Sequence, residues 1–180
     1  MTTFFSHMES ALGTVLLVSG AARLTGAYFL GQKYQAQPLR DWCEDPELPV
    51  LERAQAELRE YLDGARREFE LPLAPSGTPF QQRVWQALCA IPYGQTITYG
   101  ALAQSIGSPK SVRAVGTAVG RNPISIVIPC HRVIGADGSL TGYAGGLPRK
   151  QALLELEGAQ ASLTHGVRAD DQGVLSFGGT

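Results

Sequence analysis

The 180-residue chain has no apolar run that approaches the roughly 20 residues needed to cross a membrane as a helix. Its first residues lack a basic stretch followed by an apolar core, so we expect no export signal. Only three cysteines are present, and their uneven spacing excludes a disulfide framework. These absences predict a cytoplasmic protein with free thiols and no membrane contact.

Soft metal ligands are also scarce. Residues 1–77 offer only His7 and Cys43, whereas a structural zinc site needs four protein ligands. Cys43 stands among acidic residues that disfavour a thiolate, and Cys89 is expected to be a small buried hydrophobic side chain. We therefore expect no metal ion and no cofactor.

The charged residues, 17% of the chain, are unevenly divided. Residues 1–76 hold 7 Lys or Arg against 11 Asp or Glu, whereas residues 77–165 hold 7 against 3. This pattern is typical of a protein in which one domain binds a polyanion and its partner domain does not touch it. Ordinary variation between surfaces would also explain a difference of this size.

A linker rich in proline and glycine, residues 71–77, divides the chain into two predicted domains. The first, residues 1–76, contains short runs of aliphatic and aromatic residues broken by glycines, followed by a segment of helical period. We expect a small α/β domain with a three-stranded antiparallel sheet and one helix. The predicted strands are residues 2–6, 13–19 and 24–30, and the predicted helix is residues 49–63.

The second predicted domain, residues 77–165, is mostly helical and is followed by a tail over residues 166–180. Two short helices, residues 99–106 and 110–120, flank a turn that contains Gly107, which is the arrangement of a helix-turn-helix. This signal for DNA binding is weak by itself, because many enzymes contain such a pair. The overall fold class predicted is α/β (α+β).

The strongest chemical signal lies in residues 122–134. A run of mostly β-branched residues ends at Pro129, and the thiol of Cys130 and the imidazole of His131 follow directly. These are the two groups from which a thiolate nucleophile is made. Because a proline fixes its own φ and restricts the residue before it, Pro129 can hold Cys130 in a fixed, partly buried pose.

The motif PCHRV at residues 129–133, with RNP at 121–123 and GYAGG at 142–146, resembles the active-site signature of the O6-alkylguanine-DNA alkyltransferases. The match runs from about Thr78 to Gly158, and the preceding residues match only loosely. The resemblance implies DNA repair by direct reversal in a monomer without a cofactor. An alkyl group would pass irreversibly, once per molecule, from O6-alkylguanine or O4-alkylthymine in double-stranded DNA to Cys130.

The same resemblance implies roles for particular residues. Cys130 would be the nucleophile and methyl acceptor, and His131, held by Glu157, would take its proton through a water molecule. Asn122 would brace the turn around the cysteine, and the hydroxyl of Tyr99 would hydrogen-bond the purine. The pocket for the base is expected to be formed by Tyr99, Val133, Tyr143, Ala144 and Gly145. Many relatives have serine in place of Ala144, so only a backbone N–H is expected there.

The second helix of the pair would enter the minor groove, where Arg113 matches the family's intercalating arginine. Arg113 would fill the base stack after the damaged base is flipped out. The small residues of this helix would allow close approach to DNA, although packing on a neighbouring helix explains them equally well. The other residues expected on DNA are Ser111, Ala114, Thr117 and Ala118.

Two other classes of function remain open. A thiol hydrolase or acyltransferase would use Cys130, His131 and Glu157 through an acyl-enzyme, and it would release many products per molecule. A non-catalytic sensor of DNA lesions would keep the helix pair and the pocket but would need no thiol. The presence of Cys130 argues against the sensor.

Overall fold

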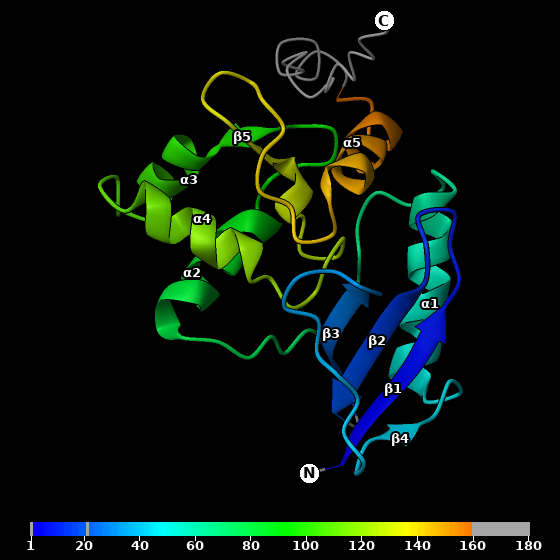
Figure 1. The fold of residues 1–180 in the computed structure, drawn as a ribbon. Helices are drawn as coiled ribbons and strands as arrows, with labels where there is room; N and C mark the ends of the chain where they lie inside the picture. The colour runs from blue at the N-terminus through cyan, green and yellow to red at the C-terminus, as the bar shows by residue number, and fades with distance from the viewer. Residues whose placement is uncertain (1, 21, 160–180) are drawn as a thin grey trace, which may run out of the picture.

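The computed structural model of the chain describes residues 2–20 and 22–159. The predicted tail, residues 166–180, lies outside the described residues, as do the last residues of the predicted second domain, 160–165. A small sheet with one helix forms the first part of the chain, and a helical part follows (Figure 1). The predicted fold class is therefore confirmed. No helix within the described ranges is long and apolar enough to cross a membrane.

The sheet has the order β3-β2-β1-β4. Strands β1 (Thr3–Met8), β2 (Val15–Gly20) and β3 (Arg23–Phe29) are antiparallel neighbours, as the sequence predicts. The fourth strand, β4 (Cys43–Glu44), pairs parallel to β1 and was not predicted, because it has only two residues in a segment without a clear period.

Alternation along β2 gives the sheet two different faces. Leu17 belongs to the main core, which α1 (Pro49–Leu62) shares, whereas Leu16 belongs to a smaller cluster on the opposite face. Helix α1 buries a stripe that includes Leu51, Leu58 and Tyr61, all without measurable exposure. The helical period of the sequence predicts this stripe.

The helical part consists of α2 (Pro79–Cys89), α3 (Tyr99–Ser105), α4 (Val112–Gly120) and α5 (Leu147–Leu156). A parallel pair of short strands, β5 (Ile97–Thr98) and β6 (Val133–Ile134), lies among them. Helix α2 begins with a capping box, in which the Thr78 hydroxyl accepts from the Gln81 N–H and the Gln81 side chain accepts from the Thr78 N–H.

Helices α3 and α4 are joined by a short turn in which Gly107 has a φ of +70°, a conformation that favours glycine. Helix α4 begins at Val112 rather than at Lys110, where the sequence predicts its start. Lys110 still belongs to a turn, in which the Ser111 N–H donates a hydrogen bond to the Ser108 carbonyl. Cys89, expected to be buried, is exposed at the last position of α2.

The two parts of the chain meet along β3. The Ala27 N–H donates to the Pro123 carbonyl at 2.9 Å, and the Ser125 N–H donates back to the Ala27 carbonyl at 2.8 Å. Figure 1 shows β3 as the strand of the sheet that lies nearest the helical part. The segment that leads to Cys130 is thus hydrogen-bonded to the first part of the chain, and one continuous core includes residues of both parts.

Candidate active site

Cys130 opens a 3-10 turn, Cys130–Arg132, directly after Pro129. Its side chain is buried, and the Asn122 side-chain amide donates to its Sγ at 3.1 Å and to the Ile128 carbonyl at 2.8 Å. Ile126, in the turn that precedes this one, has a φ of +72°, which is rare for a β-branched residue and stores strain there. The position of the sulfur therefore depends on a bent backbone, and the hydrogen bonds from Asn122 help to keep that backbone in place.

Burial raises the pKa of the Cys130 thiol above its usual value. The hydrogen bond from Asn122, the nearby Lys150 and the backbone N–H groups of the turn oppose this rise only in part. The thiol form therefore prevails at neutral pH. A nucleophile at this position needs a base that removes its proton during the reaction.

His131 and Glu157 form a fully buried pair, with 2.9 Å between His131 Nε2 and Glu157 Oε1. Burial by itself would raise the pKa of Glu157, but hydrogen bonds from His131, Arg132 and Tyr61 hold it far below its usual range. Burial also lowers the pKa of His131, so the imidazole is neutral at pH 7.

Because an ionised carboxylate can only accept, the hydrogen of the neutral His131 must be on Nε2. The other ring nitrogen, Nδ1, is then a proton acceptor, and it has no hydrogen-bond partner among the described residues. The buried pair thus leaves His131 in the tautomer that a general base requires.

Three buried polar residues around this pair were not singled out from the sequence. Arg132 donates to both carboxylate oxygens of Glu157, with distances of 2.8 and 2.9 Å, and also to the Ile91 carbonyl. The Tyr61 hydroxyl donates to Glu157 Oε1 at 2.5 Å. Lys150, the third, has no measurable exposure.

Lys150 lies three and four residues before Leu153 and Leu154 on α5, and this spacing puts it on the buried face of the helix. Its ammonium group donates to the carbonyls of Val133 and Thr141, and burial lowers its pKa to about 8. A lysine on the apolar stripe of a predicted helix is a signal that could have identified it. Lys150 joins β6 to the glycine-rich segment that follows Thr141.

A cavity of about 680 Å³ opens between α4 and the glycine-rich segment. The sequence places five residues in the base pocket, and three of them, Tyr99, Tyr143 and Ala144, line this cavity. Cys130 is not among the lining residues, but it belongs to the same buried core cluster as Tyr143, which does line the cavity.

The other two pocket residues are placed differently. Val133 is fully buried in β6, and Gly145 is enclosed, because a Cβ there would stand 2.7 Å from the Tyr143 ring and 3.1 Å from the Phe29 ring. Neither lines the cavity. The hydroxyl of Tyr99, expected to face a purine, donates instead to the Thr141 carbonyl at 3.0 Å.

Helix α4 presents Arg113, Ala114 and Thr117 to solvent, and Ser111 is half-buried just before it. Arg113 and Thr117 also line the cavity. Ala118, expected on the DNA-binding surface, is buried instead: its carbonyl accepts from the Trp85 indole at 2.9 Å, so it packs on α2. Small residues of α4 therefore lie both on its exposed side, as Ala114 does, and on the side packed against α2, as Ala118 does.

The first part of the chain reaches the cavity as well. Lys33 and Tyr34 line it, the Lys33 N–H donates to the Ala144 carbonyl at 3.2 Å, and the Arg121 guanidinium lies 5.2 Å from the centre of the Tyr34 ring. The acidic first part of the chain therefore contributes residues to the wall of this cavity, because a net charge says nothing about the position of a single loop.

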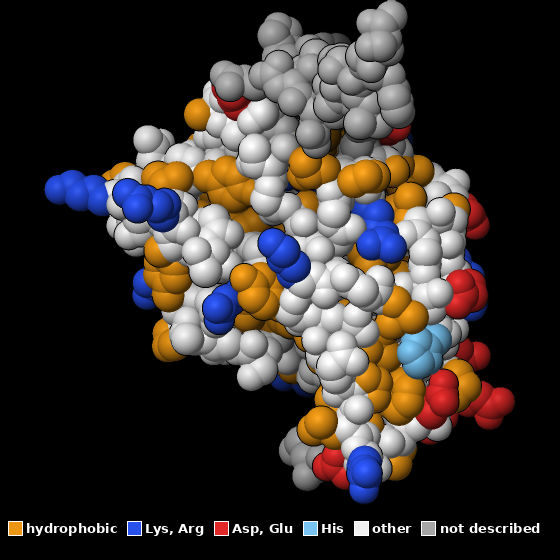
Figure 2. All heavy atoms as spheres, in the orientation of Figure 1, with side chains coloured by type: hydrophobic (Ala, Val, Ile, Leu, Met, Phe, Trp, Pro, Cys, Tyr) orange, Lys and Arg blue, Asp and Glu red, His pale blue; other side chains and the backbone are white. Residues whose placement is uncertain are grey.

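The distribution of charge at the surface is visible on one face of the molecule. Figure 2 shows Lys and Arg side chains spread over the helical part and most of the visible Asp and Glu side chains at the edge beside α1.

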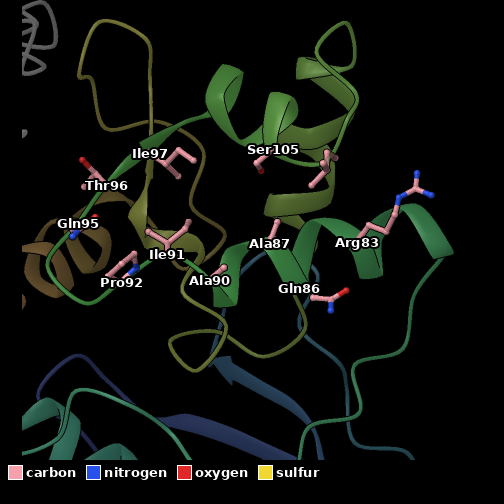
Figure 3. Close-up of a pocket in the computed structure, with 11 residues that line it drawn as sticks. Arg83, Gln86, Ala87, Ala90, Ile91, Pro92, Gln95, Thr96, Ile97 and Ser105 are labelled. Atoms are coloured by element: carbon pink, nitrogen blue, oxygen red, sulfur yellow. The ribbon is translucent and has the colours of Figure 1, made fainter.

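A second cavity of about 640 Å³ lies between α2 and α3 (Figure 3). The residues that line this second cavity include no thiol, imidazole or carboxylate. Within the described ranges, no three His, Cys, Asp or Glu side chains gather as a metal site.

Two family models match the chain. Residues 3–75 match the ribonuclease-like domain of 6-O-methylguanine DNA methyltransferase, and residues 79–159 match its DNA-binding domain. The chain belongs to the 6-O-methylguanine DNA methyltransferase family. The resemblance seen in the sequence is thereby confirmed, and it extends to the first part of the chain, where the motifs are weak.

Individual relatives agree with this family. A methylated-DNA–protein-cysteine methyltransferase of Methanosarcina barkeri is 48% identical over 154 residues, which cover 86% of this chain and 96% of the relative. That of Haemophilus influenzae is 45% identical and covers 86% of both chains. The crystal structure of Mycobacterium tuberculosis OGT in complex with DNA is 44% identical, with a TM-score of 0.80 over 89% of this chain and 94% of the other.

Proposed function

We propose that this methyltransferase family member repairs double-stranded DNA by transferring an alkyl group, typically methyl, from O6 of guanine to the sulfur of Cys130. The observation that carries the proposal is the buried Cys130 beside His131, whose tautomer Glu157 fixes. Cys130 shares a core cluster with Tyr143, which lines the cavity together with Arg113. O4-alkylthymine is the second substrate, because it carries the same alkyl–oxygen bond beside a ring nitrogen.

The chemical step follows from these groups. His131 accepts the Cys130 proton at Nδ1, by way of a water molecule, because neighbouring residues in a tight turn seldom face each other. The thiolate attacks the alkyl carbon, so that a sulfur–carbon bond forms as the carbon–oxygen bond breaks. The electron pair of the broken bond stays on the guanine, which takes up a proton and leaves as the normal base.

The tyrosines that line the cavity support recognition of a flat base. Tyr99 and Tyr143 are walls against which a purine can stack. The Tyr99 hydroxyl, now on the Thr141 carbonyl, would turn toward the oxygen that gains charge as the bond breaks. A base inside a duplex cannot reach Cys130, so the damaged nucleotide must be flipped out while Arg113 fills its place.

Each molecule is expected to react once as a monomer. A thioether is not hydrolysed by water under these conditions, and the other cysteines, Cys43 in β4 and Cys89 at the end of α2, are exposed elsewhere.

The division into a domain over residues 1–76 and one over residues 77–165 is also part of the proposal. The linker and the separate family matches on either side of it support this division.

Intact-mass measurement after incubation with a duplex that contains O6-methylguanine tests the proposal. We expect a gain of one methyl group, located to Cys130, and a plateau of one repaired base per protein molecule. Cys130→Ser should gain nothing while DNA binding is retained, since phosphate contacts come from the helix pair. Turnover beyond the protein concentration would instead favour the thiol hydrolase. A parallel duplex with O4-methylthymine tests the second substrate.

A further inference from the structure

Tyr61 is a fully buried tyrosine from the first part of the chain that reaches the reactive pair in the second. It occupies the last turn of α1, and its hydroxyl lies 2.5 Å from Glu157 Oε1 and 3.3 Å from His131 Nε2. These partners are 96 and 70 residues away in sequence. No other residue of the sheet-and-helix part is hydrogen-bonded to the pair within the described ranges.

The hydroxyl must be the donor in its contact with Glu157. The carboxylate is ionised, because hydrogen bonds and nearby positive charge hold its pKa far below the usual range, so it can only accept. The pKa of Tyr61 is raised by burial and by Glu157, so the phenol keeps its proton. The oxygen of Tyr61, 3.3 Å from His131 Nε2, is then an acceptor, so the N–H of His131 lies between Glu157 Oε1 and Tyr61.

We propose that Tyr61 is a positioning residue for the alkyl transfer: it holds the Glu157–His131 pair in the arrangement that leaves Nδ1 of His131 ready to accept the Cys130 proton. The first part of the chain is thereby a component of the reaction centre. This inference rests on the function proposed above, in which His131 acts as the base.

Arg132 also binds Glu157, but it comes from the same turn as His131, whereas Tyr61 comes from α1. The guanidinium donates to both oxygens of the carboxylate and thus fixes its position from one side. Tyr61 donates only to Oε1, the same oxygen that accepts from His131. Loss of the hydroxyl therefore removes a hydrogen bond from Oε1, and Oε1 is the oxygen that keeps the hydrogen of His131 on Nε2.

A change at Tyr61 should also alter the protonation of His131. The charged and titratable groups around the imidazole are Glu157 and Lys150 from α5 and its end, Arg132 and Cys130 from its own turn, and Tyr61 from α1. Without the hydroxyl, the carboxylate has one donor fewer and attracts a proton on His131 more strongly. The imidazolium form, which cannot act as a base, would then persist to higher pH.

The test compares Tyr61→Phe with the wild type in reaction with free O6-benzylguanine, which removes DNA binding from the measurement. The phenyl ring keeps the contacts of Tyr61 with the rings of Phe69, at 5.1 Å, and Tyr93, at 6.0 Å. A general base contributes roughly 100- to 10,000-fold, so a variant that loosens the base without removing it should react about 10-fold more slowly. The acid side of the pH–rate profile should move to higher pH.

Tyr93→Phe is the matched control. It removes a neighbouring hydroxyl that donates to the Leu156 carbonyl at 3.1 Å and does not touch Glu157. We expect its rate to stay within about twofold and its pH profile to stay in place, whatever its loss of stability.

The possible outcomes separate this inference from the proposed function. If the wild type gains no alkyl group on Cys130, the function itself is wrong. If the wild type reacts and Tyr61→Phe matches it in both rate and pH profile, only the inference is overturned. A Tyr61→Phe protein that does not fold would also overturn it, because the hydroxyl would then serve the fold rather than the base.

Discussion

Replacing Glu157 by glutamine should destabilise the protein far more than a change of one atom suggests. The carboxylate accepts hydrogen bonds from Tyr61, His131, Arg132 and the Gly94 N–H, and its side chain has no measurable exposure. An amide keeps the shape but offers a single accepting oxygen and no charge. Arg132 would then be a buried cation without its counter-charge.

The magnitude follows from the burial of the pair. Removing one partner of a buried ion pair costs about 3–5 kcal/mol, whereas an exposed pair costs about 0–1 kcal/mol. In a protein of this size, 1 kcal/mol corresponds to about 2–4 °C in Tm, so we expect Glu157→Gln to melt about 6–20 °C below the wild type. The free energy of unfolding is only about 5–15 kcal/mol, so the variant should stay folded with a small margin.

The pH dependence gives a second check. The pKa of Glu157 is lowered in the folded state, so its stabilisation is complete above the unfolded value of about 4.3 and is lost as the pH falls below it. The difference in unfolding free energy between wild type and Glu157→Gln should therefore be constant from pH 5 to 7 and shrink below about pH 4.

Urea unfolding of both proteins across this pH range is the assay. Glu155→Gln is the control, because Glu155 lies on the same helix but is exposed, and its carboxylate accepts a hydrogen bond from the Gln151 side chain at 2.8 Å. That variant should stay within about 0.5 kcal/mol of the wild type. A loss below about 1 kcal/mol for Glu157→Gln would refute the view that a buried charge network holds the site together.

Three further predictions concern residues around the cavity. Arg113→Ala should slow repair of duplex DNA far more than reaction with free O6-benzylguanine, and Arg113→Lys should rescue poorly because an ammonium lacks a planar face; equal slowing of both reactions would make Arg113 a folding residue. The pKa of Lys150 is lowered to about 8, so its buried charge destabilises the fold below that pH and the penalty fades toward about pH 10.5. Urea unfolding should thus show the wild type gaining stability between these values relative to Lys150→Met, and parallel curves would contradict this. Asn122→Ala removes the side chain that donates to Cys130 Sγ, so the reaction with O6-benzylguanine should slow and stability fall by about 1–3 kcal/mol; an unchanged rate would exclude Asn122 from the chemistry.

The sequence predicts the elements well where local rules decide them. Strands bounded by glycines, the helix that starts at Pro49 and the helix predicted over residues 99–106 all appear where the pattern places them, within a few residues. The strand at Cys43 was missed because two residues carry no period. The exposure of Cys89 was missed because it depends on which segments cover the end of a helix.

The candidate site is predictable where its residues lie in one motif. Cys130 and His131 are adjacent in sequence, and Asn122 is only eight residues from the sulfur that it binds. Tyr61 is not predictable in this way, because its position on the apolar stripe of α1 indicates core packing and says nothing about a carboxylate 96 residues away. Long-range hydrogen bonds leave no periodic trace in a sequence.

The reaction itself should destabilise the protein. Cys130 is 4% exposed, its Sγ lies 3.1 Å from the Asn122 amide, and Ile126 in the preceding turn already has an unfavourable backbone conformation. An added methyl group must find space in this packing, and overpacking by one or two carbons costs about 1–3 kcal/mol. The thioether also has no proton for His131 to accept, so the buried network loses the function for which it is arranged.

Thermal melting before and after stoichiometric reaction measures this effect, with Cys130→Ser treated in the same way as the control. At about 2–4 °C per kcal/mol, the alkylated protein should melt about 2–12 °C below the unreacted one, and a benzyl group should lower the midpoint more than a methyl group. An unchanged or raised midpoint would show that the wall formed by Tyr99 and Tyr143 already leaves room for the product. The turn before Cys130 follows directly on α4, so strain from the adduct has a short covalent path to the helix that carries Arg113. The same packing that holds the thiol in place for a single reaction should therefore loosen the repaired complex.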